Sequence, residues 1–562
     1  MSINNIPLSD YPRPQLRRDS YISLNGYWDY AIRDSNEFPN EFDGKILVPF
    51  SPETNKSEVN RFVNPTDFLF YRREIIFPSN FIKDKVIIHF GAVDQICDVY
   101  FNDRLLTHHE GGFLPFEVEI DRDRIKKVNE LKLRVKDYTD TSYYSRGKQK
   151  LNHGGIWYSP QSGIYMPVWM ESVREDYIQK VKFTPDIDNN VIKVLVNSTS
   201  KEVTLELNKD KYKIQTNVEV EIEIKDPHLW YTDDPYLYEV TISNHHDTIS
   251  SYFAMRKFSV LDKDGYKVLA LNNKPIFMKG VLDQGYYNDT LLTPPNIEAY
   301  EKDLKLIKDL GFNTVRKHIK IESLIWYHLC DKLGLIVWQD MVNGGTTYKF
   351  STISFPLVTK RHHSDLNHKK FSRMDIEGRR DTVKEFKETI NLLYNSPSIA
   401  LWTLFNEGWG QFDSKRIYEE MKEIDSTRIY DHASGWHDQG ISETKSLHVY
   451  FTKVKMPNKK QVKNRAIILS ECGGYNLEIE GHKASEKNFG YKYMNSKQEL
   501  MATYQKFIER DILLNIPKGL SAFIYTQLSD VEDELNGFIT FDREVVKVDK
   551  NYIRYINDKV HF

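Results

Sequence analysis

The alternation of hydrophobic and polar positions divides the chain into three regions. Residues 1–172 contain short runs rich in β-branched and aromatic residues, such as Asp67–Phe77, which turn signals separate. Residues 173–260 continue in the same way, and Val218–Ile224 alternates apolar with acidic residues as a half-buried strand does. The first region is predicted to be a β jelly-roll sandwich and the second an immunoglobulin-like β-sandwich.

Residues 261–562 follow a different pattern, in which short apolar strands alternate with amphipathic helical segments. Pro295–Leu310, for example, places Ile297, Tyr300 and Leu304 on one helical face. Eight strands with intervening helices predict a C-terminal (β/α)8 TIM barrel, with the helix between strands five and six short or absent. An open doubly wound sheet is the alternative, but no glycine fingerprint follows the first strand. The eight predicted strands are Ile276–Leu282, Thr314–Ile319, Leu335–Gln339, Ile399–Phe405, Arg428–His432, Leu447–Phe451, Ile467–Ser470 and Ala522–Gln527.

Composition narrows the possible partners. The 562 residues suffice for three to four domains at roughly 150 residues each. The net charge of −3 removes the electrostatic argument for a nucleic acid or an anionic membrane as partner. No apolar run approaches the roughly 18 residues that cross a bilayer, and no signal peptide is recognised, so a cytoplasmic protein is expected. The three cysteines, Cys97, Cys330 and Cys472, show no metal-ligand spacing, and neither a metal nor another cofactor is expected.

A long segment, residues 342–375, interrupts the predicted barrel between its third and fourth strands. It carries Lys360, Arg361, His362 and His363, and His368 follows a few residues later. A solvated lid over the mouth of the barrel is the favoured interpretation, and a metal-binding loop is the alternative.

Two glutamates close predicted barrel strands. Glu407 follows the fourth strand and Glu471 follows the seventh, and a glycine comes one or two residues after each. A carboxylate at the end of a buried strand is costly unless it is used or paired. Functional groups of a (β/α)8 barrel lie at the carboxyl ends of the strands, and strands four and seven lie across the barrel from each other. Two facing carboxylates suit glycoside hydrolysis, with retention of configuration at a separation of about 5 Å and inversion at a larger one. A pair of rim salt bridges is the alternative.

The chain resembles glycoside hydrolase family 2, which contains β-galactosidases, β-glucuronidases and β-mannosidases. The resemblance covers essentially the whole chain and rests on the order and spacing of short motifs. These motifs are Ser23–Trp28, His109–Phe113, Ser162–Tyr165, Val168-Trp169, Leu229-Trp230, Pro235–Tyr238, Phe253–Phe258, Asn313–His318, Leu335–Asp340, Leu404–Glu407, Ile468–Glu471, Thr526–Glu532 and Asn536-Gly537.

This resemblance implies a retaining mechanism in which Glu407 is the general acid/base and Glu471 the nucleophile. It also implies that Asn406 binds the sugar 2-hydroxyl. Other side chains at strand ends are candidates for binding the sugar or supporting the glutamates, and each could instead have a structural role. These candidates are Arg316, His318, His448, Tyr450, Asp283, Asp340 and Trp436, with Trp338 and Trp409 as further aromatic candidates.

One departure from the family bears on the substrate. Glucuronidases of the family hold the substrate carboxylate with an Asn-x-Lys element, whereas Glu534–Gly537 contains no lysine at the corresponding place. A neutral sugar is therefore favoured, and a retaining exo-β-galactosidase is the leading expectation. The alternatives are a β-mannosidase, a β-glucuronidase, or a non-catalytic carbohydrate-binding protein, which retention of both glutamates disfavours. A homo-oligomer is expected from the resemblance alone.

Overall fold

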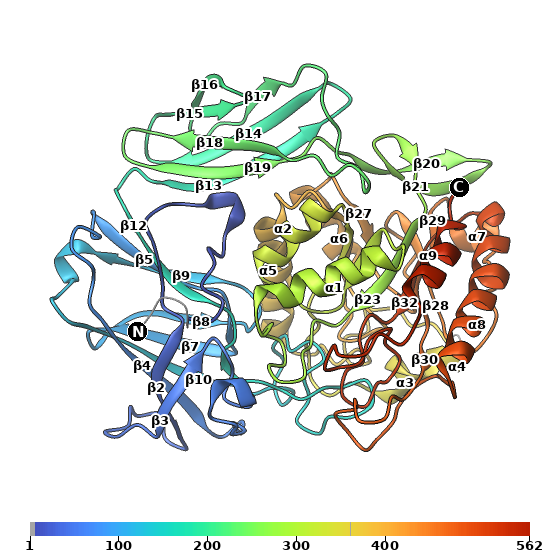
Figure 1. Ribbon diagram of the computed structural model, residues 1–562, viewed down its shortest axis with the longest axis horizontal. Helices are drawn as coiled ribbons and strands as arrows, with labels where there is room; N and C mark the ends of the chain where they lie inside the picture. Colours follow the sequence, from blue (N-terminus) through green and yellow to red (C-terminus); the bar gives the residue numbers. More distant parts are fainter. Residues whose placement is uncertain (1–5, 360) are drawn as a thin grey trace.

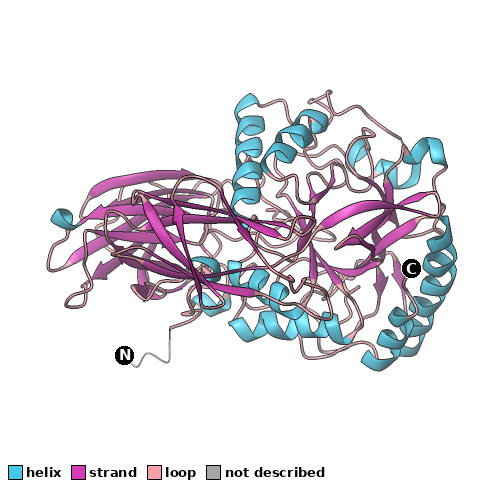
Figure 2. Cartoon of the chain, turned by 90° about the horizontal axis from the view of Figure 1, so that it is seen from above, coloured by secondary structure: helices cyan, strands magenta, loops and turns pink. Residues whose placement is uncertain are grey.

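The computed structural model describes residues 6–359 and 361–562. Lys360, which belongs to the long segment of residues 342–375, here called the basic segment, lies outside the described residues. Figure 1 shows three parts: an N-terminal β-sandwich, a second β-sandwich along one edge of the molecule, and a C-terminal barrel beside both. Figure 2 shows that nearly all helices surround the barrel. Among the described residues, no helix is long and apolar enough to cross a membrane.

The N-terminal part is a sandwich of two antiparallel sheets, as predicted. Strand β10 shows why the sequence folds this way, because Leu131, Leu133 and Val135 alternate with solvent-facing residues and enter the core between the sheets. A short pair, β6 (Val93–Asp94) with β11 (Gly163–Ile164), lies beside them. One sheet has the order β1 (Tyr21–Ser23), β12 (Val168–Val173), β5 (Lys85–Phe90), β9 (Phe116–Asp121); the other has the order β3 (Gly44–Val48), β2 (Gly26–Arg33), β4 (Phe68–Ile75), β10 (Asn129–Lys136), β7 (Ile96–Phe101), β8 (Arg104–Glu110).

The second part is the predicted immunoglobulin-like sandwich. Its core is built from alternating residues of both sheets, including Ile192, Val194 and Val196 of β14. It is tied to the barrel by the buried indole of Trp230, which donates a hydrogen bond to the backbone oxygen of Asp331 at 2.9 Å. One sheet has the order β13 (Ile178–Asp186), β14 (Val191–Ser198), β17 (Val220–Glu223); the other has the order β16 (Asp210–Gln215), β15 (Glu202–Leu207), β18 (Tyr238–Ser243), β19 (Thr248–Phe253).

A small sheet leads into the C-terminal part and covers the amino end of the barrel. Its strands are β20 (Phe258–Lys263), β21 (Tyr266–Leu271) and β22 (Lys274–Pro275). Leu269 and Leu271 of β21 belong to the same buried cluster as residues of the barrel interior. The barrel is therefore closed at one end by apolar packing, which leaves the carboxyl ends of the strands for a site.

The C-terminal part is the predicted barrel of eight parallel strands. Each predicted strand overlaps an observed one, and no helix occurs within residues 432–443, all of which are described, between β27 and β28. These two edge strands lie next to each other, and the Thr444 hydroxyl donates a hydrogen bond to the Tyr430 backbone oxygen at 3.1 Å. The order around the barrel is β27 (Ile429–Asp431), β26 (Ile399–Thr403), β25 (Ile336–Asp340), β24 (Thr314–Lys317), β23 (Met278–Asp283), β32 (Leu520–Thr526), β29 (Ala466–Gly473), β28 (Thr444–Val449).

The helices of this part pack their apolar faces against the strands. Helix α1 begins after Asn296, whose side chain accepts a hydrogen bond from the Ala299 backbone N–H, and it buries Tyr300, Leu304 and Ile307 as the sequence predicted. A further two-stranded pair, β30 (Tyr475–Asn476) and β31 (Lys492–Tyr493), lies in the loop after β29. The helices are α1 (Ile297–Asp309), α2 (Leu324–Leu333), α3 (Phe350–Ile353), α4 (Phe355–Thr359), α5 (Ile376–Leu393), α6 (Ser414–Ile424), α7 (Lys459–Val462), α8 (Lys497–Phe507) and α9 (Lys550–Asp558).

The basic segment, residues 342–375, contains the short helices α3 and α4 and packs beside the loop after β27. The His437 ring of that loop bonds the Thr352 backbone oxygen at 2.9 Å. His368 pairs with Asp413, which precedes α6, at 2.8 Å. These contacts tie the segment to the loops after β26 and β27, which supports the lid interpretation.

Candidate active site

Glu407 and Glu471 face each other at the carboxyl end of the barrel. Glu407 lies four residues beyond β26, whereas Glu471 lies within β29. One carboxylate oxygen of each and a ring nitrogen of His448 all lie within 4.8 Å of one another. This spacing matches the separation of about 5 Å that a retaining glycosidase requires.

The backbone holds Glu407 in an uncommon conformation. Its φ is +50°, a left-handed value that costs a non-glycine residue roughly 1 to 3 kcal/mol. The loop after β27 holds it there, because the Glu407 N–H donates to the Ser434 oxygen and the Trp436 indole donates to the Glu407 oxygen, each at 2.9 Å. The side chain is thereby fixed in direction, with 12% of its surface exposed to the mouth.

Hydrogen-bond donors surround Glu471. Arg316 donates to one carboxylate oxygen at 3.1 Å, and the Tyr450 hydroxyl donates to the other. Burial alone would raise the pKa of Glu471, but the interactions with His448 and Arg316 outweigh it and lower this pKa to about 2. Glu471 is therefore ionised at neutral pH, as a nucleophile must be.

The environment of Glu407 has the opposite effect. Burial raises its pKa above the usual 4.5, and the negative charge of Glu471 raises it further. A hydrogen bond of 2.8 Å from the His448 ring acts against this shift without cancelling it. The pKa values of the two carboxyl groups are thus shifted in opposite directions, so that Glu407 keeps its proton to higher pH while Glu471 stays charged.

Arg316 connects the groups of the site. Its fully buried guanidinium donates to Asp340 at 2.9 Å, to the Ser470 backbone oxygen at 2.9 Å and to the Asn406 side-chain oxygen at 2.9 Å. The amide nitrogen of Asn406 is buried and has no partner among the described residues. Because Arg316 fixes the oxygen of this amide, its N–H groups are left to a ligand.

The remaining candidates, His318, Asp340 and Asp283, are held by hydrogen bonds to neighbouring side chains. The Nδ1–H of His318 donates to the Asp340 carboxylate at 2.7 Å, and burial lowers the pKa of His318 to about 4, so the ring is neutral at pH 7. Asp340 is occupied by hydrogen bonds from Arg316 and His318, which hold it in place, and its contact with a sugar hydroxyl stays a prediction. Asp283 is likewise occupied, by Lys317 at 2.6 Å, and no direct contact joins it to either glutamate among the described residues.

The three tryptophan candidates also divide into one packing residue and two residues next to the site. Trp338 is fully buried in the barrel core, where its indole contacts Met278, so it is a packing residue. Trp436 lies beside His448 with ring centroids 5.5 Å apart. Trp409 lies 6.0 Å from His318. Trp436 and Trp409 therefore lie next to the site, where they remain candidates for contact with a sugar.

Several side chains near the site were not predicted from the sequence. Lys148 and Tyr158 come from the N-terminal sandwich, and Glu534 comes from the segment after β32. The Tyr158 hydroxyl donates to the Glu534 carboxylate, and the Lys148 ammonium lies 4.9 Å from the Trp409 ring centroid. Tyr491 stacks on Tyr450 at 3.9 Å. No spacing in the sequence pointed to these residues, because domain docking and loop folding bring them together.

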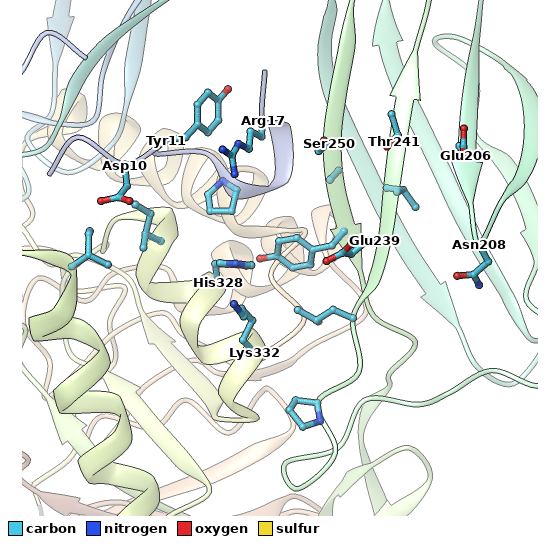
Figure 3. A pocket seen from close by; sticks show the side chains of 18 of the residues that line it. Asp10, Tyr11, Arg17, Glu206, Asn208, Glu239, Thr241, Ser250, His328 and Lys332 are labelled. Carbon is cyan, nitrogen blue, oxygen red and sulfur yellow. The ribbon is translucent and has the colours of Figure 1, made fainter. Parts of the chain in front are cut away.

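Two cavities lie in different parts of the described structure, one of them near this region. One, of about 690 Å³, is lined by Trp436 and by His448, whose ring bonds Glu407. The other, of about 850 Å³, lies between the N-terminal segment, the second sandwich and α2, where Arg17, Glu239 and His328 line it (Figure 3). Glu407 and Glu471 line neither cavity, and the second lies at a junction between domains.

The described residues contain two groups with metal-ligand geometry. One is Glu407, His448 and Glu471. Both oxygens of Glu471 already accept hydrogen bonds from Arg316 and Tyr450, which suits a free carboxylate better than a cation ligand. The other group, His482, Asp542 and Glu544, lies partly exposed away from the catalytic pair.

Comparisons with known families match all three parts of the chain. Residues 263–545 match the TIM barrel domain of glycosyl hydrolases family 2. Residues 171–256 match the model described as glycosyl hydrolases family 2, and residues 48–168 match the sugar binding domain of the same family.

Curated relatives and solved structures are similar over different shares of their length. A beta-galactosidase of Thermoanaerobacter pseudethanolicus is 23% identical over 433 residues, which are 72% of this chain and 53% of that protein. A beta-glucuronidase of Streptococcus agalactiae is 24% identical over 71% of this chain and 68% of that protein. The chain thus spans about half the length of several curated relatives that it matches.

Two solved structures share the fold over the full chain. The GH2 beta-galacturonidase of Eisenbergiella tayi, bound to galacturonate, has a TM-score of 0.72 at 17% identity and covers 99% of this chain and 100% of that one. The beta-glucuronidase of Ruminococcus gnavus has a TM-score of 0.76 at 15% identity, again with 99% and 100% covered.

Proposed function

Because the chain belongs to glycosyl hydrolases family 2, we propose that it is a retaining β-glycosidase in which Glu407 and Glu471 cleave an O-glycosidic bond. The observation that carries this proposal is the separation of the two carboxylates, with one oxygen of each within 4.8 Å. An inverting enzyme needs a larger gap of about 6.5 to 9.5 Å, because a water molecule must fit between the sugar and the base.

The reaction takes two steps. Glu471 attacks the anomeric carbon while Glu407 gives its proton to the leaving oxygen, and a glycosyl ester of Glu471 forms. The ester carries no charge, so the repulsion that raised the pKa of Glu407 is lost and its pKa falls. Glu407, which has given up its proton, therefore stays ionised and can act as the general base. It then removes a proton from water, which attacks the anomeric carbon and releases the sugar with its original configuration.

The sugar is bound through the free donor of Asn406. Its unpartnered amide nitrogen supports a hydrogen bond to the 2-hydroxyl, and such a bond can strengthen in the transition state. A β-galactoside remains the leading neutral substrate from the sequence, and the similarity to beta-galactosidases supports it. The similarity to beta-glucuronidases supports the uronide alternative, whereas the opposed ionisation of the two glutamates argues against a non-catalytic protein.

Hydrolysis of a panel of nitrophenyl glycosides tests the proposal. The panel contains β-galactoside, β-glucoside, β-mannoside, β-glucuronide and β-galacturonide. We expect at least one β-glycoside to be cleaved, and proton NMR of the first turnovers to show the β-anomer of the sugar before mutarotation. Early release of the α-anomer would contradict the retaining mechanism. Wild type and Glu471→Ala that bind sugar yet are equally inert would contradict the enzyme assignment.

Tyr450 provides a separate test of how Glu471 is held. Tyr450→Phe removes the hydroxyl that donates to Glu471 but keeps the ring that stacks on Tyr491. A hydrogen bond to a charged group contributes about 1.5 to 3 kcal/mol, so kcat/KM should fall roughly 10- to 100-fold. Tyr418→Phe, which removes a hydroxyl bonded to Glu443 outside the site, is the matched control. Equal kinetics of both variants would show that Tyr450 has only a packing role.

A further inference from the structure

We propose that Lys148 binds a carboxylate on the sugar held between Glu407 and Glu471, so that the preferred substrates are β-uronides. The proposal rests on the proposed function and deepens it. It also differs from the neutral sugar that the sequence favoured, since that expectation considered only the segment Glu534–Gly537. The structure brings a cation to the site from another domain.

Lys148 lies at the mouth of the barrel although it belongs to the N-terminal part. Its residue is 6% exposed, and its ammonium lies 4.9 Å from the ring centroid of Trp409, two residues beyond Glu407. The rings of Tyr158 and Trp157 lie 5.5 and 5.9 Å from it. Burial raises the pKa of both Glu407 and Glu534, and the charge of Lys148 acts against this rise. The ammonium therefore faces the catalytic groups.

This ammonium lacks the partner that a buried cation needs. Among the described residues, no carboxylate lies within 4.0 Å of it and no acceptor forms a hydrogen bond with it. The three other buried lysines each have an acidic partner: Lys317 with Asp283, Lys320 with Glu322, and Lys547 with Asp530. Burial of an unpaired charge is unfavourable, so Lys148 is the buried lysine whose charge a bound anion would neutralise.

The surrounding charges define which anion fits. Glu407, Glu471 and Glu534 share the region, and Arg316 is already occupied by Asp340, Asn406 and Glu471. One free ammonium among three carboxyl groups suits a single carboxylate and disfavours a phosphate or sulfate dianion. The C6 carboxylate of a uronic acid is the single negative charge that a pyranose carries close to its ring.

The loop that carries Lys148 is fixed to the barrel. The Gly155 N–H donates to Asp533 at 2.9 Å, and the Ser159 N–H donates to Glu532 at 2.9 Å. On the other side, the Gln149 amide donates to Asp94 of the N-terminal sandwich at 2.7 Å. The loop that positions Lys148 is thus held in place before any ligand arrives, which reduces the entropic cost of binding.

The test compares substrates that differ only at C6. Wild type and Lys148→Met are assayed with 4-nitrophenyl β-galacturonide and β-galactoside, and with the corresponding glucuronide and glucoside. We expect wild type to prefer a uronide, and Lys148→Met to lose about 100-fold in kcat/KM for that uronide, chiefly through KM, because a charge-assisted contact is removed. The neutral partner should change less than about threefold. Lys150→Met, a change of the same type two residues away, should alter neither substrate.

Other results separate the possible failures. A wild-type preference for the neutral sugar, or an equal loss on both sugars, would overturn the role of Lys148 and leave the glycosidase assignment intact. A shift of the pH profile that is the same for both sugars would show that Lys148 only tunes Glu407. If no glycoside is cleaved, calorimetric binding of sodium D-galacturonate and sodium D-glucuronate decides. Binding that Lys148→Met weakens at least about tenfold, with D-galactose unaffected, supports the proposal, and equal binding to both proteins overturns it.

Discussion

Glu471→Ala should reduce kcat/KM on every cleaved glycoside by on the order of 10⁴- to 10⁶-fold, because the variant has no group to form the glycosyl ester. Steady-state rates with an aryl glycoside measure this loss. The fold should persist, since Glu471 is held by side-chain donors from Arg316 and Tyr450 and its removal leaves a hole at the mouth of the barrel. Glu423→Ala, a change at an exposed position of α6, is the matched control and should retain wild-type activity.

Azide makes this prediction specific for a nucleophile. Azide can enter the space that the carboxylate leaves and attack the anomeric carbon from the same side, so Glu471→Ala with azide should yield an α-glycosyl azide. Proton NMR identifies the anomer. Formation of the β-glycosyl azide by this variant, or residual activity within about tenfold of wild type, would contradict the role of Glu471.

The strands and the facing positions of Glu407 and Glu471 could be predicted from the sequence because both depend on local pattern. The predicted barrel strands are runs of four to seven residues. Parallel strands are buried on both sides, so most of them appear as nearly continuous apolar segments. Glu407 and Glu471 follow two such runs, and the geometry of a closed barrel brings the ends of these strands together. Nothing beyond the order of the strands was needed.

The partners of the acidic side chains could not be predicted in this way. Asp283 lies opposite Lys317 in the register of β23 and β24. Arg316 lies opposite Trp338 of β25, and Asp340 projects from the same side of the strand two residues later. These pairs depend on the exact register between neighbouring strands, which sequence patterns leave open.

Lys148 shows a second limit. Its neighbours Trp409 and Glu534 come from the barrel, and its own loop is oriented by contacts with Glu532 and Asp533. The site is therefore completed by docking of the N-terminal part against the barrel. A substrate preference that is inferred from barrel motifs alone lacks this contribution.

Glu407→Ala should divide substrates according to their leaving groups. A 2,4-dinitrophenyl glycoside leaves without a proton, so its glycosylation step should change less than about tenfold. A methyl or phenyl glycoside needs the proton that Glu407 supplies, and its kcat/KM should fall roughly 10²- to 10⁴-fold. The plot of log kcat/KM against the pKa of the leaving group should accordingly become steeper than for wild type. An equal loss on both classes of substrate would contradict the assignment of Glu407 as the general acid.

The pH dependence provides the second half of this test. Burial and the charge of Glu471 raise the pKa of Glu407, so its proton is present at low pH and is lost as the pH rises through that raised value. The alkaline limb of kcat/KM for wild type should report this loss, and Glu407→Ala should remove the limb for a 2,4-dinitrophenyl glycoside. Azide should accelerate the variant and yield a β-glycosyl azide, because it attacks the intact ester of Glu471 from the face that water would use. An alkaline limb that survives in the variant would assign it to another group, and an α-glycosyl azide would exchange the roles of the two glutamates.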